Sequence, residues 1–171
     1  QRTGPRGGAP DLSSDPVAFD QPRGHWTPPP AADRPLAGLK VLDMGVIVVG
    51  AETGRLLADL GADVIKVENG AFPDGQRQSR DDAPVSITFA AGHRNKRGLS
   101  IDLRADAGKT LFARLVGEAD VLLSNFKPGT FDALGFSPDR LRALNPRLVS
   151  VDSSAFGATG PWSRRGGYGP L

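Results

Sequence analysis

The stretch from residue 40 to residue 68 constrains the fold most, because it places a helix pattern between two strand patterns. Lys40–Met44 has the pattern of a buried strand, and a turn over Gly45–Gly50 leads into a helix over Glu52–Leu60. Leucines at 56, 57 and 60 have the spacing of an apolar helical stripe. Gly61 ends the helix, and Asp63–Glu68 is the next strand. Such a unit makes a right-handed crossover, which predicts a parallel sheet.

The rest of the chain continues this alternation. Strand patterns cover residues 99–103, 119–123 and 148–151, and helix patterns cover 105–117 and 138–144. Residues 69–97 form a long polar connection of the kind that is usually functional or mobile. The alternation predicts an α/β fold with a doubly wound, mainly parallel sheet.

The first 36 residues have a different composition from the rest. They hold eight of the 15 prolines, with Gly, Ser and Asp between them. Such a segment buries too little apolar surface to offset its ordering entropy. We expect residues 1–36 to be a proline-rich linker or disordered arm, and residues 37–171 to form the α/β domain.

Composition excludes several classes of protein. The formal charge is only +2 and the basic residues are scattered, which argues against nucleic-acid binding. The chain has no cysteine and two histidines in different segments, so disulfides, a cysteine nucleophile and a metal site are not expected. There is no long apolar run and no signal-peptide pattern, so we expect a cytoplasmic protein without membrane contact. Because the chain begins at Gln1 and stops after Tyr168–Leu171 without a closing element, we expect a piece of a longer polypeptide.

The clearest candidate site follows the strand pattern that ends at Leu123. Asn125, Phe126 and Lys127 come directly after it, where open α/β sheets bind ligands. The amide can donate and accept hydrogen bonds, the ring can cover a flat group, and the ammonium can meet a phosphate. A strand-to-helix turn without a binding role explains Pro128 and Gly129 equally well.

Two further patterns leave alternatives open. The cations of His93–Arg97 can meet phosphates at the mouth of the sheet, or they can form a solvated charged turn. Glu68 ends the second strand where a dinucleotide-binding protein holds a ribose hydroxyl. However, the turn over Gly45–Gly50 lacks the G-x-G-x-x-G spacing, so a nucleotide-dependent oxidoreductase is a weak alternative.

Several segments in order resemble the amino-terminal region of the family III CoA-transferases, over roughly residues 35–171. That family includes formyl-CoA and carnitine CoA-transferases and alpha-methylacyl-CoA racemase. The segments that carry the resemblance are Leu36–Asp43, Leu56–Glu68, Asn95–Arg97 with Ile101–Leu103, Ala119–Gly129, Leu134–Gly135, Leu144–Arg147 and Gly157–Pro161.

The resemblance implies a Rossmann-like large domain, of which this chain is an incomplete fragment, and interlocked homodimers. It implies transfer of CoA from an acyl-CoA to a carboxylic acid through an aspartyl-CoA intermediate, with no tightly bound cofactor and no metal. The nucleophilic aspartate is expected after Leu171, so the fragment alone would be inactive. Carried over by position, the CoA-binding residues are Val48, Val49, Ile101, Asp102, Leu103, Arg104, Asn125, Phe126, Lys127 and Tyr168.

This sequence departs from the family at positions that bear on function. Asn69 and Ala133 stand where family members often carry CoA-contacting arginines. Tyr168 stands where racemases of the family place a histidine base, and a phenol with a pKa near 10 is a poor base, which disfavours a racemase. The proline-rich arm suggests an alternative in which this segment belongs to a non-catalytic scaffold half of a fused two-half transferase.

Overall fold

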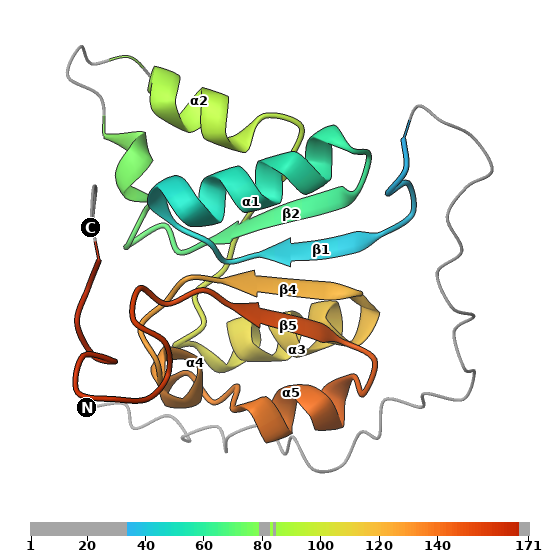
Figure 1. Cartoon of the computed structure of the whole chain (residues 1–171). Helices are drawn as coiled ribbons and strands as arrows, with labels where there is room; N and C mark the ends of the chain where they lie inside the picture. Colours follow the sequence, from blue (N-terminus) through green and yellow to red (C-terminus); the bar gives the residue numbers. More distant parts are fainter. Residues whose placement is uncertain (1–33, 79–82, 84, 168–171) are drawn as a thin grey trace, which may run out of the picture.

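The computed structural model describes residues 34–78, 83 and 85–167, and its centre is one parallel sheet (Figure 1). The strands are β1 (Lys40–Asp43), β2 (Asp63–Glu68), β3 (Arg97–Ser100), β4 (Val121–Ser124) and β5 (Val149–Asp152). Their order is β3-β2-β1-β4-β5, and every neighbouring pair is parallel. The predicted doubly wound α/β fold is confirmed. The expected arm over residues 1–36 lies almost wholly outside the described residues.

Helices cover both faces of the sheet (Figure 1). On one side lie α1 (Ile47–Asp59) and α2 (Ile87–His93), and on the other lie α3 (Asp106–Glu118), α4 (Thr130–Ala133) and α5 (Pro138–Leu144). A short 3-10 helix, η1 (Gly75–Arg77), precedes α2. No helix in the described ranges combines the length and the apolar character needed to cross a membrane.

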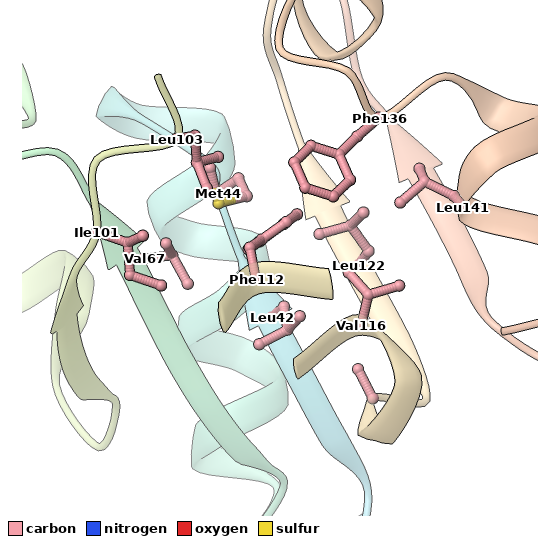
Figure 2. Packing of buried hydrophobic residues seen from close by; sticks show 11 residues of the cluster. Leu42, Met44, Val67, Ile101, Leu103, Phe112, Val116, Leu122, Phe136 and Leu141 are labelled. Carbon is pink, nitrogen blue, oxygen red and sulfur yellow. The ribbon is translucent and has the colours of Figure 1, made fainter. Parts of the chain in front are cut away.

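The larger hydrophobic core lies between the sheet and α3 (Figure 2). Phe112 and Val116 of α3 are fully buried there, and the Phe136 ring meets Phe112 edge-on at 4.9 Å between centroids. Met44 and Leu103 belong to the same cluster, so the core continues to the carboxyl ends of the strands. A smaller cluster on the α1 side contains Val41, Ala58, Ala62, Val64 and Leu123.

Helix α1 packs on the sheet mainly through small residues, and of the predicted leucine stripe Leu57 alone is packed, partly buried against the smaller cluster. Its buried residues are Gly50, Ala51, Gly54 and Ala58, whereas Leu56 and Leu60 are 53% and 45% exposed. A Cβ added at Gly54 would lie 2.8 Å from the Asp43 carboxyl carbon, so the helix backbone is too close to the sheet for large side chains.

The connection over residues 69–97 is more structured than its polar composition predicts. It contains η1 and α2, and the hydroxyl of Ser86 caps α2 by accepting the Phe89 N–H at 3.0 Å. Strand β3 also begins two residues earlier than predicted and ends at Ser100. Ile101 and Leu103 therefore lie in the turn that follows β3, where both are buried.

Candidate functional site

The candidate site lies where the direction of the sheet reverses. From β1 the chain builds β2 and β3 to one side, and β4 and β5 occupy the other side. In open α/β sheets, ligands bind outside the carboxyl ends of the two strands that flank such a point. A cavity of about 440 Å³ opens there, and we call it the switch-point pocket. Its lining residues are Met44, Val46, Val67, Glu68, Asn69, Phe72, Asp74, Ile101, Leu103, Arg104, Phe126, Thr130, Ala133 and Leu134.

The switch-point pocket combines apolar walls with one positive group. Among the described residues that line it, Arg104 is the one cation. Its guanidinium lies 4.5 Å from the centre of the Phe72 ring, and Phe72 is 61% exposed. Phe126 supplies a second aromatic ring on the other side of the sheet reversal, after β4. Two carboxylates also line the pocket, but Glu68 pairs with Arg77 and Asp74 pairs with Lys66. With those charges paired, Arg104 and the two rings suit a ligand with a flat ring and an anionic group.

The structure brings some of the expected binding residues together and separates others. Ile101, Leu103, Arg104 and Phe126 line the pocket, and Asp102 lies beside it, where its carboxylate accepts from the Asn69 amide at 3.1 Å. Val48 and Val49 lie apart, exposed on the first turn of α1. Lys127 lines an adjoining cavity of about 520 Å³ next to α5, which shares Phe126 and Thr130 with the switch-point pocket. Tyr168 lies outside the described residues.

Asn125 is bound to the protein backbone. Its Nδ2 donates to the Val46 carbonyl at 2.8 Å, and its Oδ1 accepts the Val46 N–H, also at 2.8 Å. Both ends of the amide are therefore engaged by the segment that joins β1 to α1.

A buried network of charged side chains lies beneath the same segment. Lys66, in the middle of β2, donates to the Gly45 carbonyl and lies 3.1 Å from the Asp74 carboxylate. The Asp74 carboxylate also accepts the Ile47 N–H at 3.1 Å, and His93 Nε2 lies 3.5 Å from it. The side chains of Lys66, Asp74 and His93 are 2%, 0% and 4% exposed. Sequence reasoning missed this network, although a lysine inside an apolar strand was a visible signal.

A second buried ion pair continues the network. Lys96 Nζ lies 2.7 Å from Asp43 Oδ2, and it also contacts the Ala51 carbonyl at 2.8 Å and His93 Nδ1 at 3.1 Å. Burial lowers the pKa of Lys96, and the charge of Asp43 opposes that effect. The attraction between Lys96 and Asp43 offsets the free-energy cost of burying each charge.

Asp74 is held in its ionised form. Burial acts to raise its pKa, but the contact with His93, the Gln76 N–H and the charge of Lys66 outweigh burial and hold the pKa far below the usual 3.8. A depressed carboxyl pKa contributes stability that is complete above the unfolded-state pKa and is lost as pH falls through the folded-state pKa.

We therefore expect Asp74→Asn to weaken the dependence of the free energy of unfolding on pH at acid pH. The variant should lose about 2 kcal/mol of unfolding free energy at pH 7, because the hydrogen bonds to a charged acceptor are weakened. Below pH 3.8 the difference from wild type should shrink, since Asp74 then binds a proton in the unfolded wild-type chain and stays ionised in the folded one. Urea unfolding between pH 2 and pH 7 measures this, with the exposed Asp139→Asn as control. Curves for wild type and Asp74→Asn that stay parallel would contradict the assignment.

The geometry disfavours a dinucleotide at this site. In dinucleotide-binding folds the pyrophosphate sits at the amino end of the first helix, but here the Asp74 carboxylate accepts the Ile47 N–H at that end of α1. Glu68, the expected ribose partner, instead accepts two hydrogen bonds from Arg77 at 2.9 and 2.7 Å. Both positions that would hold the cofactor are occupied by the protein's own groups.

The cations of the turn before β3 are likewise paired with carboxylates. Arg94 Nη2 lies 2.7 Å from Asp59, and Arg97 pairs with Asp63. Lys96 is the buried partner of Asp43. Ion pairs therefore tie this segment to α1, β1 and β2, and neither of the two expected alternatives describes it fully.

Comparison with known proteins agrees with the fold. A family model described as CoA-transferase family III matches residues 36–171. The probable CoA-transferase Rv1866 of Mycobacterium tuberculosis is 53% identical over 159 residues, which are 89% of this chain and 20% of that relative. The succinyl-CoA–L-malate CoA-transferase alpha subunit of Chloroflexus aurantiacus is 35% identical over 173 residues, which are 91% of this chain and 38% of that relative.

A solved structure of a related protein has the same fold. A CAIB/BAIF family protein from Brucella suis superposes with a TM-score of 0.73 at 40% identity, over 80% of this chain and 38% of that chain. The chain thus spans between 20% and 38% of the length of these relatives. Because the family model covers almost all of the described domain, the chain belongs to CoA-transferase family III.

Proposed function

We propose that the full-length protein transfers CoA from an acyl-CoA to a carboxylic acid, and that this segment supplies its CoA pocket. Membership of CoA-transferase family III supports the reaction class. Relatives named succinyl-CoA–L-malate CoA-transferase alpha subunit and succinate–glutarate CoA-transferase, 35% and 37% identical, support a carboxylic acid as acceptor. The protein is proposed to act in the cytoplasm as an interlocked homodimer or with a fused second half.

The observation that carries the proposal is the switch-point pocket. Its volume of about 440 Å³ falls in the range of small-ligand sites, and its walls are mainly apolar. In this proposal the adenine ring of CoA packs against Phe126 or Phe72, and the guanidinium of Arg104 binds a phosphate; the lining of the pocket supports both roles. Ile101 and Leu103 then form the apolar floor.

The chemical step is proposed to use a carboxylate nucleophile elsewhere in the full-length polypeptide. An aspartate oxygen attacks the thioester carbonyl, and CoA thiolate leaves to give an acyl-aspartyl anhydride. The thiolate then attacks the aspartyl carbonyl and releases the donor acid, which leaves aspartyl-CoA. The acceptor carboxylate attacks that thioester in turn, and the released thiolate takes the acceptor acyl group and frees the aspartate.

A second proposal is that this segment belongs to a scaffold half of a fused transferase. Its support is the length of the 53% identical relative. The matched 159 residues make up 20% of that relative, whereas the matched 173 residues make up 38% of the Chloroflexus subunit. The former chain is therefore about twice as long. The uncharged residues at Asn69 and Ala133, which both line the pocket, also fit a half that binds CoA weakly.

Arg104→Ala tests the pocket. We expect it to weaken CoA binding by about 10- to 100-fold, because a hydrogen bond to a charged group contributes about 1.5–3 kcal/mol. Isothermal titration calorimetry with CoA measures the effect, and Arg114→Ala on the outer surface of α3 is the matched control. Equal affinity in both variants would refute the proposed pocket.

The chemistry is tested on the full-length polypeptide by intact mass after incubation with a panel of acyl-CoAs. A hydroxylamine-sensitive adduct, mapped to an aspartate in the same half as this segment, supports the transferase proposal. An adduct mapped only to the other half supports the scaffold proposal.

A further inference from the structure

Every polar backbone group from the Gly45 N–H to the Ile47 N–H is bound by a side chain. Asp43 accepts the Gly45 N–H at 2.8 Å, and Lys66 donates to the Gly45 carbonyl. Asn125 binds both the N–H and the carbonyl of Val46, and Asp74 accepts the Ile47 N–H. We call this three-residue segment, Gly45–Ile47, the clamped loop.

The four side chains reach the clamped loop from separate elements. Asp43 ends β1, Lys66 lies in β2, Asp74 precedes η1, and Asn125 follows β4. In an ordinary surface loop, water would bind some of these backbone groups. Here the surrounding structure determines the whole backbone path.

The clamped loop holds a strained conformation. Ile47 has a φ of 57°, in the left-handed region that a β-branched residue avoids. Such strain persists only where the surroundings over-determine the backbone, and it concentrates at functional sites. Val46, the central residue of the loop, lines the switch-point pocket, and so does Met44 just before it.

We propose that Asn125 and Lys66 are positioning residues for CoA binding, which act by holding the clamped loop in place as a wall of the switch-point pocket. The inference rests on the proposed function, since CoA is the ligand. It assigns Asn125 a role through Val46, in place of the direct CoA contact that the family resemblance implies. Lys66 does not line the pocket and is 2% exposed, so it reaches a ligand only through the loop.

A double-mutant cycle in CoA binding tests the proposal on the full-length protein. When one of the two restraints is removed, the other still holds most of the loop in place. Asn125→Ala or Lys66→Met alone should therefore raise the Kd about fourfold, whereas the double variant should raise it about 80-fold. The excess over the product of the single effects is the signature of a shared loop. A double variant whose effect equals that product would overturn the proposal and favour direct contact by Asn125.

Amide hydrogen exchange gives a second readout that does not need CoA. In Asn125→Ala the Ile47 N–H should exchange at least tenfold faster, although Asn125 does not bind it, and in Lys66→Met the Val46 N–H should do the same. The milder Asn125→Asp, which keeps an acceptor for Val46, serves if the alanine variant does not fold. Faster exchange of the Val46 N–H alone in Asn125→Ala, together with unchanged exchange of the Val46 N–H in Lys66→Met, would overturn the proposal. If the wild type binds no CoA, the proposed function fails while the exchange result still decides on the clamped loop.

Discussion

Replacing Lys96 with Met should lower the free energy of unfolding by about 3–5 kcal/mol, the usual cost of removing one partner from a buried ion pair. The Lys96 and Asp43 side chains are 1% and 0% exposed and lie 2.7 Å apart. Methionine preserves most of the length of the lysine stem, so the variant isolates the loss of the ammonium. Among the described residues, Asp43 would keep the Gly45 N–H as its one hydrogen-bond donor.

Urea unfolding measures the loss, with Lys40→Met as the matched control. Lys40 is half exposed and pairs with Glu118 at 3.5 Å, so its replacement should change stability by less than about 1 kcal/mol. Adding Asp43→Asn to Lys96→Met should restore part of the loss, because the uncompensated charge is then gone. Equal losses at Lys96 and Lys40 would show that the buried pair does not stabilise the fold.

Replacing Gly50 with Ala should lower the free energy of unfolding by about 3 kcal/mol, the upper end of the usual cost of overpacking. The added Cβ would lie 2.5 Å from the Gly45 carbonyl carbon and closer still to its Cα. Relief requires backbone movement, and Gly45 is held on one side by Asp43 and on the other by Lys66. The added methyl group therefore collides with backbone atoms that can move only at a high cost in free energy.

Gly98→Ala in β3 is the control for that experiment, since no atom lies within 4 Å of a Cβ added there. It should leave stability unchanged or slightly raised, because alanine restricts the unfolded chain. Thermal unfolding followed by circular dichroism is sufficient to compare the two. A Gly50→Ala midpoint as high as that of Gly98→Ala would mean that α1 can shift away from β1 at little cost.

Local patterns were enough to predict the alternation of strands and helices. The bounds of β2 (Asp63–Glu68) and α5 (Pro138–Leu144) agree with the prediction, because each has a clear apolar pattern and a clear end signal. Helix α1 begins at Ile47, earlier than predicted, since its first turn was read as part of the glycine-bounded turn. Helix α2 was missed, although Ser86 was a visible capping residue.

The site was less predictable because its interactions join distant positions. The placement of Phe126 and Arg104 at one pocket follows from parallel strands ending at the same edge of the sheet. Val46 lies 79 positions from Asn125, and Asp43 lies 53 positions from Lys96, so no local pattern specifies either pair. A polar residue after a strand has the same sequence signature whether it binds a ligand or a neighbouring backbone. Only the packed structure separates these two roles.

The clamped loop is complete only when β4 has joined the sheet, because Asn125 follows that strand. One of its restraints comes from Asn125, which follows β4, so a chain that has paired β1, β2 and β3 but not β4 still lacks a fixed pocket wall. Contacts of such high sequence separation form late, after the entropy of closing a long loop has been overcome. A ligand of this pocket would therefore recognise the finished domain alone, and it would protect the protein by slowing unfolding while leaving the rate of folding almost unchanged.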